Sequence, residues 1–114
     1  MGQKTQHYVQ GQWQSGSGEG IPVFDSITGE HFTSTTVRGL DVASILQYGR
    51  DNGDTLRKMT FQQRGNMLKS LAMYLTKRKQ AFYEISYRTG ATKRDSWVDI
   101  EGGFGNLFAN ASLK

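Results

Sequence analysis

The sequence predicts an α+β fold in which a β-hairpin region over residues 1–39 precedes a helical region over residues 40–114. The first third is rich in glycine and threonine and holds short β-type segments, whereas from Asp41 apolar residues recur every three or four positions. The chain has 114 residues, enough for one domain or part of one. The apolar face of its last helix has few candidate partners, so we expect a domain truncated at its C-terminal end.

Strands and turns are predicted for the first third. Tyr8–Trp13 is a short β-type segment interrupted by a glycine, and Ile21–Phe24 is an apolar segment. Pro22 has no N–H to donate, so this second segment suits an edge strand. Asp25–Glu30 is typical of a turn, because an Asp side chain bonds its own backbone and a glycine accepts positive φ. His31–Val37 is then the returning strand.

Two helices are predicted next. Asp41 is a good N-cap for the first, which ends or is interrupted over Asp51–Asp54. Thr60 and Gln63 form a capping box that opens the second, and Thr89-Gly90 ends it with a C′ glycine. The second helix carries an apolar stripe at helical spacing: Met67, Leu68, Leu71, Ala72, Leu75, Phe82 and Ile85.

A third helix is predicted from Asp95, its expected cap, towards the end of the chain. Its apolar side consists of Trp97, Ile100, Phe104, Leu107, Phe108 and Ala111. Gly102, Gly103 and Gly105 each weaken a helix by up to about 1 kcal/mol relative to alanine. We therefore expect another backbone to approach this helix closely.

Composition excludes several classes of protein. The chain contains no cysteine, which excludes a disulfide scaffold, a thiolate metal site and a cysteine nucleophile within it. No segment approaches the roughly 18 apolar residues of a membrane span, and the polar N-terminus is not a secretory signal. We expect a cytoplasmic protein with no membrane partner.

Charge is unevenly distributed along the chain. Residues 1–55 have a net charge of −3, and residues 56–114 have a net charge of +7. The basic residues that suggest nucleic-acid binding are Lys77, Arg78, Lys79, Arg88, Lys93 and Arg94, with Tyr74, Tyr83 and Tyr87 nearby. They are mixed with the polar positions of an ordinary amphipathic helix, so we expect a solvated helix face and no nucleic-acid partner.

No catalytic, cofactor-binding or metal-binding residue is predicted within the chain. His7 and His31 lack a second ligand at metal spacing. Asp95 and Asp99 share a helix face, but Asp95 is better explained as a cap; Glu101 is a candidate to face a pocket beside Phe104. Gly103-Phe104-Gly105 begins like a dinucleotide fingerprint, but the third glycine is missing and no strand precedes it.

The order of segments resembles the N-terminal part of the aldehyde dehydrogenase superfamily. Tyr8–Trp13 resembles the opening Y-I-N-G-x-W of that family, and Asp25–Glu30 resembles its N-P-x-T-G-E turn. Asp41–Ala43 resembles the start of its first helix, D-V-x-x-A. Thr60–Leu71 resembles s-x-x-x-R-x-x-x-L, and Thr89-Gly90 resembles T-G-K. Five such motifs in order span nearly the whole chain.

Within this superfamily, two segments are similar to the dehydrogenase half of the bifunctional phenylacetic acid degradation proteins. They are Ser86–Thr92 and Asp95–Gly103, and Leu40–Ala43 agrees with them. Ala91 departs from the lysine of the general T-G-K motif, which favours this subfamily. The resemblance implies oxidation of a CoA-linked semialdehyde with NADP or NAD, NADP being preferred, and a fused C-terminal hydratase-like domain.

The resemblance also implies what the chain lacks. The family's cysteine thiolate attacks the aldehyde, hydride passes to the cofactor, and a glutamate-activated water releases the acid. The cysteine, the general base and the Rossmann strands that bind the cofactor would lie beyond Lys114. We therefore expect an α+β fragment of an α/β aldehyde dehydrogenase fold that binds no cofactor and is inactive alone. Its expected partners are the remainder of that domain and, in the intact enzyme, further copies in a homo-oligomer.

The family resemblance places one group of side chains near the substrate. The helix over Asp95–Leu113 would run beside the substrate entrance, so its aromatic and aliphatic residues are candidates to line the tunnel: Phe104, Leu107 and Phe108. An aromatic stripe at helical spacing is also typical of core packing against a missing domain. A different function is open as well: a free-standing, non-catalytic binding or oligomerisation module made from the same fold.

Overall fold

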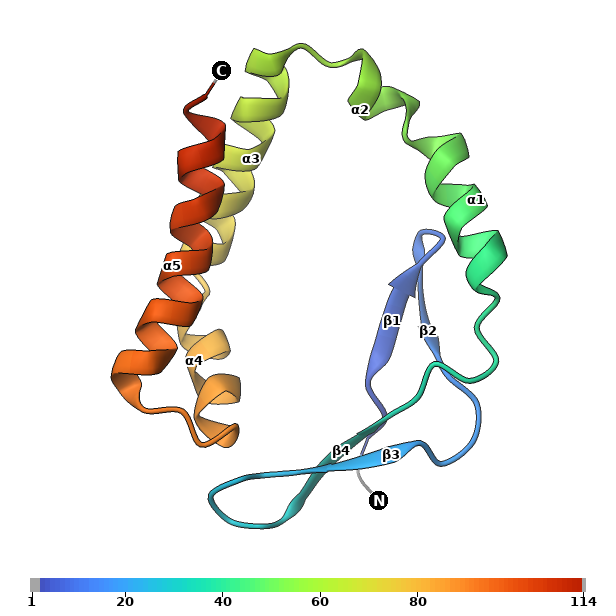
Figure 1. Cartoon of the computed structure of the whole chain (residues 1–114), viewed down its shortest axis with the longest axis vertical. Helices are drawn as coiled ribbons and strands as arrows, with labels where there is room; N and C mark the ends of the chain where they lie inside the picture. Colours follow the sequence, from blue (N-terminus) through green and yellow to red (C-terminus); the bar gives the residue numbers. More distant parts are fainter. Residues whose placement is uncertain (1–2, 114) are drawn as a thin grey trace. The chain divides into compact units, whose positions relative to one another are not determined.

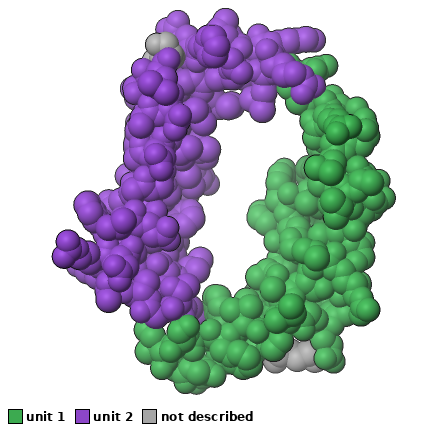
Figure 2. All heavy atoms as spheres, viewed as in Figure 1, with its two compact units in different colours: residues 1–55 green, residues 56–114 purple. Residues whose placement is uncertain are grey.

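The computed structural model describes residues 3–113, which divide into two compact units between Thr55 and Leu56 (Figure 2). Strands precede helices along the chain, as the sequence predicts (Figure 1). The described residues form two separate antiparallel hairpins and five helices, rather than the one hairpin region and three helices expected. None of these helices is long and apolar enough to cross a membrane.

The first hairpin joins β1 (Gln6–Val9) to β2 (Gln12–Ser15), and Tyr8 is paired with Trp13. The β-type segment expected over Tyr8–Trp13, interrupted at its glycine, is thus a tight hairpin of two strands. The chain reverses at Gln10 and Gly11, whose φ values of 53° and 76° are those of a type I′ turn. Glutamine rarely adopts positive φ, so the sequence gives only a weak turn signal here.

The second hairpin pairs β3 (Ile21–Phe24) with β4 (His31–Thr35) and confirms the predicted return strand. The predicted turn is also confirmed. An Asp25 carboxylate oxygen accepts the backbone N–H of Ile27 at 2.8 Å, and Gly29 has a φ of +75°. Local side-chain chemistry thus fixes this turn.

The helix α1 (Val42–Asn52) completes the first unit, and Asp41 caps it as predicted. The Asp41 carboxylate accepts hydrogen bonds from the hydroxyl of Ser44 at 2.6 Å and from its backbone N–H at 3.1 Å. These bonds hold the pKa of Asp41 below its ordinary value. Gly53 ends α1, and the short helix α2 (Asp54–Lys58), which the sequence does not predict, follows.

The second predicted helix is two helices. The capping box of Thr60 and Gln63 opens α3 (Phe61–Thr76) as expected, and α4 (Lys79–Arg88) begins after a break. The expectation of a continuous helix to Thr89 is therefore wrong, although Gly90 does follow its end with a φ of +86°. At the break the Thr76 hydroxyl donates to the carbonyl of Ala72. The Arg78 N–H bonds only three residues back, which tightens the turn and ends the helix.

The last helix, α5 (Lys93–Ala111), packs against both α3 and α4. Its cap is Thr92, not Asp95 as expected, because the backbone of Thr92 is extended and its hydroxyl accepts the Asp95 N–H at 3.1 Å. The Asp95 carboxylate in turn accepts the Thr92 hydroxyl proton at 2.7 Å. Asp95 thus supports the cap from the first turn, where an acidic group is favoured.

The packed interior is small. Among residues 3–113 the buried apolar side chains are Ala72, Tyr83 and Ala111. Ser96 is fully buried and its hydroxyl lies 2.8 Å from that of Ser86. Larger apolar side chains of the predicted stripes remain exposed, including Leu71 at 45% and Ile85 at 56%. A small core with large exposed apolar side chains is typical of a surface that another part of a protein covers.

The glycines of α5 face open space. A Cβ placed on Gly102, Gly103 or Gly105 would meet no described atom within 4 Å outside the helix's own neighbouring backbone. The close backbone that these glycines lead us to expect is therefore not found in the described part of the chain.

Candidate functional site

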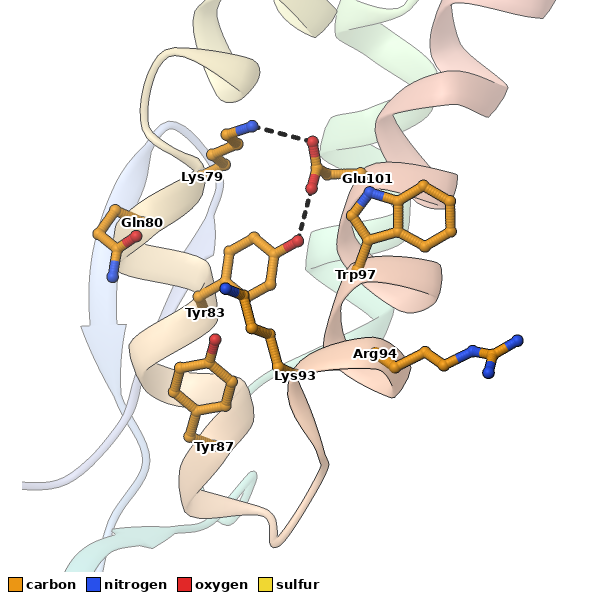
Figure 3. A pocket seen from close by; sticks show the side chains of 8 residues that line it. All are labelled: Lys79, Gln80, Tyr83, Tyr87, Lys93, Arg94, Trp97 and Glu101. Atoms are coloured by element: carbon orange, nitrogen blue, oxygen red, sulfur yellow. Dashed lines mark hydrogen bonds and ion pairs between the residues drawn. The ribbon is translucent and has the colours of Figure 1, made fainter.

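A pocket of about 570 Å³ lies between α4 and α5, inside the second unit (Figure 3). We call it the α4–α5 pocket. Its lining residues are Lys79, Gln80, Tyr83 and Tyr87 from α4, and Lys93, Arg94, Trp97 and Glu101 from α5. The volume lies within the roughly 300–1,000 Å³ typical of small-molecule sites. Aromatic rings and cationic groups thus share one concave surface.

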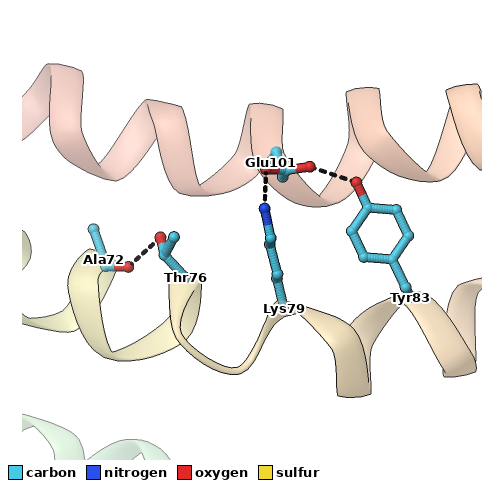
Figure 4. A network of polar contacts seen from close by, with 5 residues as sticks. All are labelled: Ala72, Thr76, Lys79, Tyr83 and Glu101. Carbon is cyan, nitrogen blue, oxygen red and sulfur yellow. Dashed lines mark hydrogen bonds and ion pairs between the residues drawn. The ribbon is translucent and has the colours of Figure 1, made fainter.

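Two polar contacts join the walls of this pocket (Figure 4). The Tyr83 phenol donates to one oxygen of the Glu101 carboxylate at 2.5 Å. The Lys79 ammonium donates to the other oxygen at 3.0 Å and forms an ion pair with it. Both acceptor oxygens of Glu101 are therefore engaged, and the carboxylate fixes α4 against α5.

The network shifts two pKa values in opposite directions. Burial, then the hydrogen bond to Glu101, raises the pKa of Tyr83 to about 12. The hydrogen bonds from Tyr83 and Lys79 hold the pKa of Glu101 below its ordinary value. At neutral pH the pair is therefore a neutral phenol and a carboxylate. Near neutral pH neither group changes its protonation state readily, so the pair is suited to positioning rather than to proton transfer.

The basic residues considered for nucleic-acid binding have separate roles. The Arg78 guanidinium lies 3.5 Å from the ring centroid of Tyr74, and Lys79 is paired with Glu101. Lys93 and Arg94 line the α4–α5 pocket. Four of the six basic residues are thus divided between packing, an ion pair and a pocket.

The three candidate tunnel residues all lie on α5. Phe104 is half-buried and contacts the ring of Phe82 edge-on, with centroids 5.5 Å apart. Leu107 is half-buried, whereas Phe108 is 38% exposed and borders a shallow depression with Lys69. The substrate-tunnel role of these residues stays a prediction.

Among the other predicted positions, the two histidines belong to the first unit. His7 Nε2 lies 2.8 Å from the carbonyl oxygen of Thr36, and His31 Nε2 lies 3.0 Å from the Ser34 hydroxyl. No cluster of three potential metal ligands occurs in residues 3–113. Glu101 does line a pocket, but its partner across that pocket is Tyr83 rather than Phe104.

Sequence reasoning places only Glu101 in a pocket. It names Lys79 and Tyr83 for nucleic-acid binding and Trp97 for an apolar helix face. Tyr83 and Glu101 are 18 positions apart, and Lys79 and Glu101 are 22 apart. No spacing rule within one helix connects residues so far apart. The available signal is weaker: a tyrosine and a lysine lie one helical turn apart on α4, and α5 carries acidic residues in its first half.

The described strands are arranged differently from those of a dinucleotide-binding fold. They form only two-stranded antiparallel sheets, whereas the phosphate cradle needs a strand that leads into a helix within a parallel sheet. The glycine-rich residues 103–105 lie in the interior of α5.

Comparison with known proteins identifies a relative. No protein-family model matches the chain. The chain is 36% identical over 101 residues to a 3,4-dehydroadipyl-CoA semialdehyde dehydrogenase from Aromatoleum evansii. The match covers 87% of this chain and 20% of that protein, so the chain spans about a fifth of its relative's length. The match confirms the predicted resemblance to the aldehyde dehydrogenase superfamily and fits an N-terminal segment of such an enzyme.

Proposed function

We propose that this chain is the N-terminal segment of an NAD(P)-dependent aldehyde dehydrogenase that oxidises a CoA-linked semialdehyde to the acid. The observation that carries the proposal is the 36% identity over 101 residues to an enzyme named for such a substrate. The order of the five family motifs along the chain supports the same origin.

The substrate class follows from two sources. The relative's name specifies a CoA-linked semialdehyde. The segments Ser86–Thr92 and Asp95–Gly103 resemble the phenylacetate-degradation subfamily, which also uses a CoA-linked semialdehyde. We infer the phenylacetate-type substrate, NADP as the preferred acceptor and a fused hydratase-like domain from that second resemblance.

The chemistry requires residues outside the chain. A dehydrogenase of this family attacks the aldehyde with a cysteine thiolate, and these 114 residues contain no cysteine. We infer that the chain is inactive alone and serves as a scaffold for the rest of the enzyme. Exposed side chains such as Leu71, Ile85 and Trp97 supply apolar surface that the rest of the dehydrogenase would cover.

The test is binding between this chain and the A. evansii dehydrogenase from which the 101 matched residues have been removed. We expect a one-to-one complex in analytical ultracentrifugation, and loss of binding of an apolar-surface dye by the chain when the complex forms. Purified chain alone, given the CoA semialdehyde and NADP, should form no NADPH. Turnover by the chain alone would contradict the proposal. If the chain forms a stable homo-oligomer and does not bind the truncated enzyme, the result would instead support a free-standing oligomerisation module.

A further inference from the structure

Charge in the α4–α5 pocket is unbalanced. Three cationic side chains line it, but the single carboxylate, Glu101, is already bonded to Lys79 and Tyr83. Lys93 and Arg94 have no hydrogen-bond or ion-pair partner within residues 3–113. Lys93 and Arg94 are thus two lining cations without a partner among the described residues, in a pocket that also contains three aromatic rings. Such an arrangement favours an anionic ligand.

The position of these cations is unfavourable for the helix itself. Lys93 and Arg94 are the first two residues of α5, directly after the Thr92 cap. The helix dipole places partial positive charge at this end, so cations here are repelled and acidic groups are preferred. An anion bound beside them would relieve this repulsion and also accept hydrogen bonds from the helix terminus.

Aromatic surface adjoins the cations. Trp97, one helical turn after Lys93 and Arg94, is 55% exposed, whereas Tyr83 on the opposite wall is 8% exposed. Figure 3 shows Trp97 and Arg94 on the α5 side of the pocket, with Tyr83 and Tyr87 on the α4 side. An exposed indole next to two cations is a combination that binds a flat base attached to phosphates.

We propose that the α4–α5 pocket binds the 3′-phosphoadenosine diphosphate handle of a CoA thioester. Lys93 and Arg94 hold its phosphates, and Trp97 stacks on its adenine. The inference rests on the proposed function, which supplies a CoA-linked substrate. NADP carries similar chemistry, but this pocket lacks the strand-to-helix phosphate cradle that a dinucleotide needs, so CoA is the ligand assigned.

The test is a titration of the 114-residue chain with CoA, followed by the fluorescence of Trp97. The substitution Trp13→Phe leaves Trp97 as the single tryptophan. We expect CoA to quench this fluorescence, and expect Lys93→Gln with Arg94→Gln to weaken CoA binding by about tenfold or more, since charged hydrogen bonds are lost. This double variant removes cations from a helix N-terminus, so its helical circular dichroism should be kept or increased.

The matched control changes charge elsewhere in the same unit. Lys58→Gln with Lys69→Gln removes the same two positive charges away from the pocket and should leave CoA binding unchanged. The proposal is overturned by no response to millimolar CoA, by equal weakening in both double variants, or by equal affinity for NADP or inorganic phosphate. The titration needs no catalysis. If the chain does not bind CoA but does assemble with the truncated dehydrogenase, this inference is wrong and the proposed function stands.

Discussion

The Tyr83 phenol donates a 2.5 Å hydrogen bond to the Glu101 carboxylate and so joins α4 to α5. Lys79 binds the second oxygen of the same carboxylate, which makes Glu101 the centre of the contact. Each partner therefore depends on the protonation state of the other. The first two predictions follow from this dependence.

Glu101→Gln should lower the pKa of Tyr83 from about 12 towards 10.0, the ordinary value. The substitution removes the negative charge and the strong acceptor that hold the proton on the phenol, whereas the burial that also raises the pKa remains. Titration of ¹³C-labelled tyrosine by NMR measures this change. Asp99→Asn, on the same helix but without a contact to Tyr83, is the control and should leave the pKa where it is. An unchanged Tyr83 pKa in the Glu101 variant would show that the hydrogen bond does not form.

The stability of the α4–α5 contact should be greatest between about pH 4.5 and 10, the ordinary values for the two groups. Glu101 has a lowered folded pKa, so its contribution is present above 4.5 and is lost as pH falls through the folded value. Tyr83 has a raised folded pKa, so its contribution is present below 10 and is lost as pH rises through about 12. Thermal unfolding followed by circular dichroism across pH measures both limbs. Tyr83→Phe should flatten the alkaline limb, and a profile that is the same in both proteins would refute this linkage.

Ala72→Leu should destabilise the second unit by about 1–3 kcal/mol, because it forces extra volume into a fully buried position. Ala72 lies on α3, which packs against α5. The control is Ser70→Leu on the same helix, where the side chain is exposed and the change should stay within about 0.5 kcal/mol. Urea unfolding compares the two variants. Equal effects would mean that α3 does not pack on α5 through Ala72.

Thr60→Ala should cost about 1 kcal/mol of helix stability, since the Thr60 hydroxyl accepts the Gln63 N–H and no other group replaces it. Thr60→Ser keeps the hydroxyl and should remain close to the parent. Hydrogen exchange of the first-turn amides of α3 measures the difference. If these amides exchange as slowly in Thr60→Ala as in the parent, packing rather than the cap stabilises the first turn of α3.

Local chemistry explains which elements could be predicted from the sequence. The Asp41 cap, the Thr60 and Gln63 box and the Asp25 turn each depend on atoms within four residues, and all three are present. The break after Thr76 contains no glycine or proline, so no local signal marks it. It lets two separate helices lie against α5, which is a tertiary preference that overrides helix propensity.

The candidate site was harder to predict than the fold. Charge pattern places Lys93 and Arg94 among the basic residues, but nothing in the sequence indicates that Glu101 is occupied by Lys79 and Tyr83. That contact depends on the separation and the rotation of two helices. Family resemblance supplied the enzyme class, and it supplied no residue of the α4–α5 pocket.

We propose that this chain is a working segment of a CoA-semialdehyde dehydrogenase. The most direct test replaces the 101 matched residues of the A. evansii relative with the corresponding residues of this chain. The chimaera is then assayed with the relative's own CoA semialdehyde and with NAD or NADP, by absorbance of the reduced cofactor. We predict a soluble chimaera that forms reduced cofactor. A chimaera that folds with the parent's helical content and assembly but forms none would contradict the claim.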